Sequence, residues 1–345
     1  SLVDRAWTWG YIIQGPLPGK VPFISESGAP PFNATSSCSL ETGARYLGTP
    51  NVVFMNSNHN MNTLTAEYLD PLAKCGQVIC ALQHGKYRET AKAVSEISKK
   101  YKNIVGGLID DFMDYHGPSK SITVEETKAI YEALKSENPA LKLYVVRYTW
   151  QDQKDLVPYL PYLDVINLWV WKAEEAPWQT TLEPEIDHIR EITGKPVILG
   201  LFIHDYGASG KAVPMNILEM QFCKATDLVR RGKTEGFIVL QNGWFDHESH
   251  RPQVQWIRQY LDWLSGPGDA RFGHRHPRLV AAARRQLDRS GLLGPDVIDE
   301  QTGRFARDLA ALVGHRRVVV LESGAAARSL AVAVARAWVA ASRGI

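Results

Sequence analysis

The sequence has no long hydrophobic run and little net charge. No apolar segment of its 345 residues reaches the roughly 18 residues that a membrane-spanning helix needs. The formal net charge of +2 does not indicate the basic surface that binds nucleic acid or anionic lipid. We therefore expect neither a nucleic-acid partner nor a membrane partner. With 45% hydrophobic and 22% charged residues, the composition is that of a globular protein.

Cysteine is scarce, and its spacing argues against the common zinc motifs. Cys38, Cys75, Cys80 and Cys223 form no CxxC pair, so a zinc finger or zinc ribbon is not expected. We interpret all four as free thiols. The sequence does not decide the cellular compartment of the protein, but the chain begins with Ser1 rather than Met. Removal of a leader, with secretion or export to the periplasm, is therefore one alternative.

Lysine is missing from the last part of the chain, which divides the sequence in two. Residues 266–345 contain 13 arginines, no lysine and seven acidic residues, a net charge of +6, whereas residues 1–265 carry −4. The C-terminal part is also rich in alanine. A change of this size indicates two segments of different origin. We predict one domain over residues 1–264 and another over residues 265–345.

The first segment alternates short β-branched or aromatic runs with longer amphipathic stretches. Thr123 and Glu126 have the spacing of a capping box at the start of one predicted helix. Eight strand–helix units in about 260 residues match a (β/α)8 barrel in number, order and size. A doubly wound open sheet is the alternative, but no glycine-rich phosphate-binding turn follows the first strand. The predicted strands occupy residues 7–13, 51–58, 77–84, 104–111, 142–150, 164–171, 196–205 and 235–242.

Polar and aromatic residues stand at the C-terminal ends of these strands, where the active sites of such barrels lie. The stretch VGGLIDDFMD places Asp110 and Asp111 directly after a buried strand. Carboxylates and amides suit sugar hydroxyl groups, and indole rings suit the apolar faces of sugar rings. The other residues that we expect to bind a carbohydrate substrate are Glu26, Asn56, His84, Arg147, Trp150, Trp169, Trp171, His204, Gln241, Asn242 and Trp244.

Two carboxyl groups across the barrel mouth are the minimum apparatus for glycoside hydrolysis. One protonates the leaving oxygen, and the other acts as a nucleophile or activates water. We assign these roles to Asp111 after the fourth strand and Asp205 after the seventh. Asp110 is a third candidate, because alternation along the strand places only one of Asp110 and Asp111 over the barrel axis.

Each of these residues also has a plain structural explanation. An aspartate after a strand commonly caps the next helix, and a single tryptophan is often part of the core. Arg147 could hold substrate or neutralise the acids. Histidines at the strand ends could bind a metal, but the first strand, Trp7-Thr8-Trp9, lacks the His-x-His pair of amidohydrolase-type metal barrels. We predict neither a metal nor another cofactor.

Five motifs mark the fourth to eighth predicted strands: GGLIDDF, VVRYTW, DVINLWVW, ILGLFIHDYG and GFIVLQNGWFD. They resemble a family of bacterial glycoside-hydrolase-like TIM barrels, and the resemblance covers residues 5–262. It implies the barrel fold. The large retaining glycosidase clan carries Asn-Glu after strand 4 and a glutamate nucleophile after strand 7. This chain has Asp110-Asp111 and Asp205 there, so an inverting enzyme or a sugar-binding protein stays open.

A second set of motifs follows: YLDWLSG, GHRHP and VVVLESGAAARS. They resemble the N-terminal part of class III, PLP-dependent aminotransferases, in which an SG-[ST]-EA turn helps to hold the cofactor phosphate. Ser323 and Gly324 match this turn, whereas Ala325 and Ala326 replace its hydroxyl residue and glutamate. Because residues 265–345 contain no lysine, no Schiff base with PLP can form within them.

The sequence therefore predicts an α/β protein with a (β/α)8 TIM barrel, followed by a truncated α/β fragment of an aminotransferase large domain. The chain is an apparent chimera. YLDWLSG fits both the last barrel helix and the first aminotransferase motif, so the join falls between residues 256 and 268. The predicted activity is hydrolysis of O-glycosyl bonds. A non-catalytic carbohydrate-binding barrel is the main alternative, and a PLP-dependent aminotransferase is a remote one. The sugar, its linkage and the oligomeric state stay open.

Overall fold

The computed structural model describes most of the first segment. The chain divides into two units, Ser1–Ser265 and Gly266–Ile345, and all described residues belong to the first. Within that unit no helix of the described residues has the length and apolar character to cross a membrane. The described residues are 2–11, 38–55, 64–113, 122–207 and 209–265.

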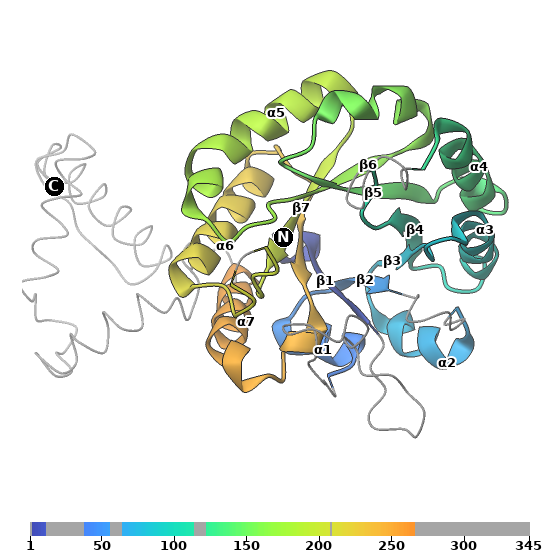
Figure 1. Ribbon diagram of the computed structural model, residues 1–345. Coiled ribbons are helices and arrows are strands. Elements are labelled where there is room, and N and C mark those ends of the chain that lie inside the picture. Colours follow the sequence, from blue (N-terminus) through green and yellow to red (C-terminus); the bar gives the residue numbers. More distant parts are fainter. Residues whose placement is uncertain (1, 12–37, 56–63, 114–121, 208, 266–345) are drawn as a thin grey trace, which may run out of the picture. The chain divides into compact units, whose positions relative to one another are not determined.

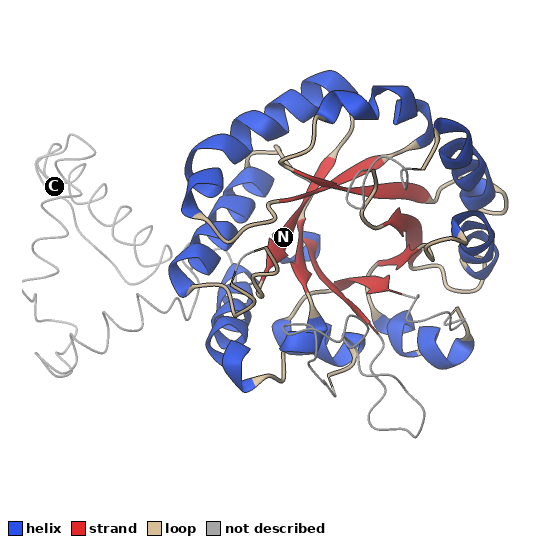
Figure 2. Cartoon of the chain, in the orientation of Figure 1, coloured by secondary structure: helices blue, strands red, loops and turns tan. Residues whose placement is uncertain are grey.

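Eight parallel strands close into a barrel in chain order (Figures 1 and 2). Each strand pairs with its neighbours in sequence, and the first strand pairs with the eighth to close the barrel. This confirms the predicted α/β class and (β/α)8 architecture. The strands are β1 (Ala6–Tyr11), β2 (Asn51–Met55), β3 (Val78–Ala81), β4 (Ile104–Ile109), β5 (Lys142–Tyr148), β6 (Val165–Trp169), β7 (Val197–Phe202) and β8 (Phe237–Leu240).

Helices surround the barrel, so the strands are covered outside as well as inside (Figure 2). β2, β3, β6 and β7 are buried along their whole length, which explains why they are continuous apolar runs. The α-helices are α1 (Leu40–Leu47), α2 (Ala66–Leu69), α3 (Tyr87–Ile97), α4 (Val124–Lys135), α5 (Leu182–Thr193), α6 (Met215–Arg230) and α7 (Arg251–Ser265). Helical segments of other types are Val3–Arg5, Pro71–Lys74, Gln153–Tyr162, Pro177–Thr181, Asn242–Trp244 and Glu248–His250.

Local sequence signals have clear structural counterparts. Thr123 caps α4 by accepting a hydrogen bond from the N–H of Glu126 at 3.1 Å, and Glu126 accepts one from the N–H of Thr123 at 2.8 Å. The predicted capping box is therefore confirmed. Gly106 allows β4 to approach β5, because a Cβ there would lie 2.2 Å from the carbonyl oxygen of Lys142. The four cysteines are free, as predicted.

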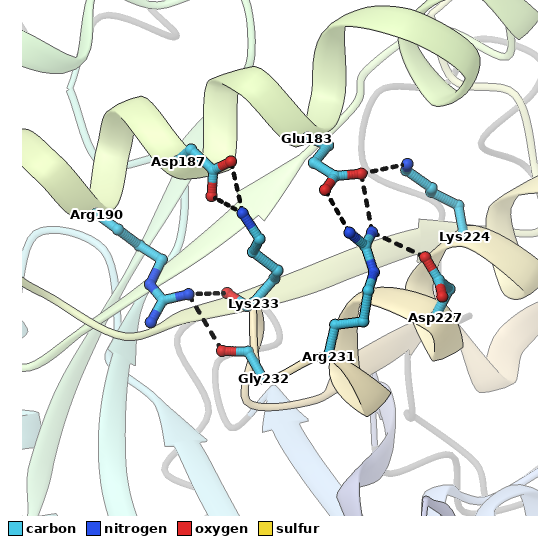
Figure 3. Close-up of polar contacts among 8 residues, drawn as sticks. All are labelled: Glu183, Asp187, Arg190, Lys224, Asp227, Arg231, Gly232 and Lys233. Atoms are coloured by element: carbon cyan, nitrogen blue, oxygen red, sulfur yellow. Dashed lines mark hydrogen bonds and ion pairs between the residues drawn. The ribbon is translucent and has the colours of Figure 1, made fainter.

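A network of charged side chains joins α5 to the end of α6 and the residues after it (Figure 3). Both carboxylate oxygens of Glu183 bind Arg231, at 2.6 and 2.8 Å, and Lys224 binds one of them at 2.7 Å. Lys233 binds both oxygens of Asp187 at 2.5 and 2.6 Å. Because Lys233 precedes the N-terminal end of β8, its contact lies away from the strand ends that carry the candidate site. We interpret the network as a stabilising one.

Candidate functional site

Two carboxyl groups follow β4 directly. The backbone N–H of Asp111 donates a hydrogen bond to Oδ1 of Asp110 at 3.0 Å. This bond holds the Asp110 carboxyl group against the backbone of Asp111. Burial, and then the charge of Asp111, raise the pKa of Asp110 well above its ordinary value. Asp110 can therefore carry a proton at a pH at which an exposed aspartate has lost it.

Asp111 is held by a tyrosine from the neighbouring strand. The hydroxyl group of Tyr148, the last residue of β5, donates to Oδ1 of Asp111 at 2.6 Å. Burial, and then the charges of Asp110 and Asp111, raise the pKa of Tyr87, the first residue of α3. His84, which was predicted to bind substrate, packs its ring against that of Tyr87 in a T-shaped arrangement with 5.6 Å between the ring centroids. The Tyr148 contact places the acid pair beside the end of β5.

Sequence reasoning missed Tyr148 and named its neighbour Arg147 instead. Adjacent residues of a strand face opposite sides, and here the tyrosine takes the side of the acid pair. Arg147 is completely buried, and its Nη2 donates to the carbonyl oxygen of Asp152 at 2.8 Å. It therefore supports the backbone of the loop that follows β5.

Aromatic rings form a surface beside the acid pair. Trp150 is 54% exposed and stacks on Tyr148, with 5.9 Å between centroids and 13° between planes. Trp171 meets Tyr148 edge-on at 5.5 Å and stacks on Tyr206 at 6.3 Å. Trp169 is different, because it is 2% exposed and packs inside the barrel. The predicted Trp150 and Trp171 thus lie together, while Trp169 belongs to the core.

The ends of β7 and β8 meet at the hydroxyl group of Tyr206. This oxygen accepts hydrogen bonds from Nε2 of Gln241 at 2.6 Å and from Nε1 of Trp244 at 2.7 Å. Burial raises the pKa of Tyr206 despite these two donors. The predicted Gln241 and Trp244 are therefore brought together by Tyr206. Asn242 instead donates to the carbonyl oxygen of Cys38 at 2.7 Å and is buried.

His204 lies in a stack of aromatic rings. Its ring is parallel to that of Trp244, with 4.1 Å between centroids and 4° between planes. Its Nδ1 shares a hydrogen bond of 3.0 Å with Nε2 of His250, the residue before α7. Burial lowers the pKa of His204 to about 4 and that of His250 to about 3, so both rings are neutral at neutral pH. Sequence reasoning did not include His250.

Asp205 is 5% exposed and accepts a hydrogen bond from the N–H of Ser209 at 2.9 Å. Burial acts to raise its pKa, but hydrogen bonds, first among them those from Ser209, outweigh burial and lower it. Asp205 therefore stays ionised where Asp110 can be protonated. Among the residues that the structure describes, no group of three or more His, Cys, Asp or Glu could hold a metal ion. Glu26, Asn56, Ser323 and Gly324 lie outside the described residues.

The fold and the strand-end residues define a (β/α)8 barrel with carboxyl groups and aromatic rings at its C-terminal mouth. Solved structures that are similar to it include the following two. One is described as an alpha-L-fucosidase from Bacteroides thetaiotaomicron, with a TM-score of 0.49, 9% identity, and coverage of 74% of this chain and 92% of that one. The other is the tryptophan synthase complex from Pyrococcus furiosus, with a TM-score of 0.42, 9% identity, and coverage of 75% and 96%. Neither similarity bears on activity.

The C-terminal part matches a different family. Residues 257–344 match the model of class-III aminotransferases. The ornithine aminotransferase of Brevibacillus brevis is 34% identical over 80 residues, which cover 23% of this chain and 20% of that protein. The ornithine aminotransferase of Bordetella pertussis is 36% identical over 88 residues, which cover 26% and 21%. The chain thus spans about a fifth of the length of these relatives.

Proposed function

We propose that the barrel is a carbohydrate-active enzyme, a glycoside hydrolase that works at the C-terminal ends of its strands. The observation that carries this proposal is the acid pair after β4. Asp110 has a raised pKa, and Asp111 is hydrogen-bonded to Tyr148, on which the exposed ring of Trp150 stacks. A protonated carboxyl group beside an ionisable one is the arrangement from which acid catalysis starts.

Asp205 supplies the second function in this proposal. Its lowered pKa keeps Asp205 ionised, so it can act either as a base that activates water or as the nucleophile itself. The raised pKa of Asp110 suits the proton donor. Environments that push two pKa values apart mark separate acid and base roles. In this proposal Asp111 contacts the substrate beside Asp110 but is neither the proton donor nor the base. Both a retaining and an inverting reaction are compatible with these roles.

The aromatic surface favours a carbohydrate over other substrates. Trp150 presents more than half of its surface to solvent while its ring stacks on Tyr148. A ring supported in this way offers a flat apolar face to the C–H face of a sugar. On the neighbouring strand ends, Nε2 of His204 and Oε1 of Gln241 are buried polar atoms without a hydrogen-bond partner in the described part of the chain, and in this proposal they are the groups of these residues that bind substrate hydroxyl groups. The same surface also supports the alternative, a barrel that binds carbohydrate without hydrolysing it.

We further propose that residues 1–264 and 265–345 are separate domains and that the second does not act as a transaminase. The matched segment covers only a fifth of the ornithine aminotransferases and contains no lysine to form a Schiff base with PLP. Absorbance near 420 nm after adding PLP would contradict this statement.

Hydrolysis of a broad panel of glycans and aryl glycosides by the full chain tests the barrel proposal. Asp110→Asn and Asp205→Asn remove the proposed proton donor and base, so each should lower turnover at least about 100-fold, the usual contribution of an acid–base group. Asp111→Asn should also lower turnover, because Asp111 contacts substrate in this proposal. Asp155→Asn, at an exposed position of the Gln153–Tyr162 segment, is the control and should leave turnover unchanged. Saturable binding of one glycan without any hydrolysis would favour the carbohydrate-binding alternative.

A further inference from the structure

The turn after β4 is bound at three successive residues by side chains from the end of β5. Each contact comes from a different side chain, and each reaches a different residue of the turn. The three contacts run from Tyr148 Oη to Asp111 Oδ1 at 2.6 Å, from Arg147 Nη1 to the carbonyl oxygen of Phe112 at 3.4 Å, and from Gln151 Nε2 to the carbonyl oxygen of Met113 at 2.6 Å.

The turn adopts a backbone conformation that needs such support. Asp111 has φ of 48° and Met113 has φ of 69°, both in the left-handed region that residues other than glycine seldom occupy. Such conformations persist where the surrounding structure holds them, and they concentrate at functional sites. Phe112, between them, is completely buried. The unusual backbone conformation of the turn therefore sets the direction of the Asp111 carboxyl group.

The side chains that hold the turn are themselves fixed. Oε1 of Gln151 accepts a hydrogen bond from the N–H of Tyr148 at 2.8 Å. Gln153 donates to the carbonyl oxygen of Tyr148 at 3.1 Å and to that of Gln151 at 2.9 Å. Arg147, Gln151 and Gln153 are all buried, with exposures of 0%, 8% and 2%. A buried network in which the members bind one another is rigid.

We propose that Arg147, Tyr148 and Gln151 are positioning residues that hold Asp111 in the orientation in which it contacts substrate. Tyr148 acts on the carboxyl group itself, and the other two act through the backbone of the turn. The catalytic meaning of this clamp rests on the proposed function, whereas its effect on the carboxyl group does not.

Loss of the Tyr148 hydroxyl group should have an effect on the acid pair that loss of a purely structural group would not have. A hydroxyl group that donates to a carboxylate favours its ionised form. Removing the Tyr148 hydroxyl group should therefore make the Asp110–Asp111 pair harder to ionise, and its titration should move to higher pH. The charges of the pair also raise the pKa of Tyr87 of α3, and Tyr87 is unchanged in this experiment.

Tyr148→Phe has a matched control within the chain. The hydroxyl group of Tyr101 donates to Oδ1 of Asp70 at 2.6 Å, the same chemistry at the same distance, but before the N-terminal end of β4. The full chain with 13C-labelled aspartate carboxyl groups is titrated by NMR, and Asp110→Asn and Asp111→Asn assign the two signals. Tyr148→Phe should shift the titration of the pair to higher pH, and Tyr101→Phe should leave it unchanged. A titration in Tyr148→Phe that equals the wild-type titration overturns the clamp.

Activity separates the clamp from the proposed function. On any glycan that the wild-type chain hydrolyses, Tyr148→Phe should lower kcat by roughly tenfold or more, because misplacing a reacting group is costly, with little change in KM. If no glycan is hydrolysed, the proposed function fails while the carboxyl titration still decides the clamp. If the wild type hydrolyses a glycan and Tyr148→Phe matches Tyr101→Phe in rate and titration, the clamp is wrong and the function stands.

Discussion

The indole ring of Trp169 on β6 occupies the space that Gly200 leaves on β7. The two residues are partners in the register of these strands, and a Cβ at Gly200 would lie 1.9 Å from Cδ2 of the indole. The indole Nε1 donates to Oδ1 of Asn167 at 2.9 Å, and Asn167 donates to the carbonyl oxygen of Ile198 at 3.1 Å. The glycine thus allows a large ring to pack inside the barrel with its polar atom satisfied.

Gly200→Ala should therefore destabilise the barrel. The added methyl group overlaps a buried ring, and overpacking of this kind typically lowers the free energy of unfolding by about 1–3 kcal/mol. Urea denaturation followed by tryptophan fluorescence measures the loss. The same substitution should cost less in a Trp169→Ala background, because the clashing ring is gone. Equal costs in the two backgrounds would show that the contact does not matter.

The fold could be predicted from the sequence because one simple pattern repeats eight times. Apolar β-branched runs followed by amphipathic stretches predicted every strand of the barrel, and the Thr123–Glu126 spacing predicted a helix start that the structure confirms. These signals are local, since each depends on residues within one strand or one helical turn. Strand ends in a barrel share one face, so the acids after β4 could also be placed at the mouth.

The sequence could not say which residues at the strand ends face one another. Arg147 and Tyr148 are adjacent, and only the register of the closed barrel decides that the tyrosine meets Asp111. His250 pairs with His204 across 46 positions of sequence, a contact that no local pattern encodes. Trp169 was expected to stack on sugar, but the gap at Gly200 places it in the core. These facts are tertiary, so they emerge only when the barrel is assembled.

The His204–His250 pair should make the fold sensitive to mild acid. Burial lowers the pKa of His204 to about 4 and of His250 to about 3, from an ordinary value of 6.5, with Asp205 and His247 as the nearby charges. Below pH 6.5 the unfolded chain therefore binds more protons than the folded one, and stability falls as the pH drops toward 4. His250→Gln should reduce this dependence in thermal melts between these pH values. His188→Gln, at an exposed position of α5, should leave it unchanged, and equal pH profiles for the two variants would contradict the argument.

Glu183 should contribute to stability in a lower pH range. Hydrogen bonds from Arg231 and then Lys224 lower its pKa from 4.5 to about 2. An acid with a depressed pKa stabilises the folded state above pH 4.5, and this contribution is lost as the pH falls toward 2. The first partner of Glu183, Arg231, is 41% exposed, so the effect is small and weakens with salt. Glu183→Gln should flatten the acid limb of the stability profile, and Glu191→Gln, exposed on the same helix, should not. A profile unchanged by Glu183→Gln would remove the charge network from the account of stability.

The end of the barrel lies inside the segment that matches the aminotransferases. That match begins at residue 257, whereas α7 runs from Arg251 to Ser265. Ile257, Tyr260 and Leu261 are 0%, 2% and 1% exposed, and the Tyr260 hydroxyl group shares a hydrogen bond of 2.7 Å with Thr226 on α6. These residues close the barrel even though their sequence resembles the start of another family.

A chain of residues 1–256 should therefore fail to fold, and a chain of residues 1–265 should fold. Cutting at residue 256 removes three buried side chains, each worth roughly 1.5–3 kcal/mol of burial, and their sum approaches the whole stability of an ordinary domain. Thermal melts followed by circular dichroism measure the difference. The 1–265 chain should unfold cooperatively, and the 1–256 chain should show no cooperative transition. Equal melting of the two chains would mean that the second half of α7 is dispensable and that the barrel ends where the aminotransferase match begins.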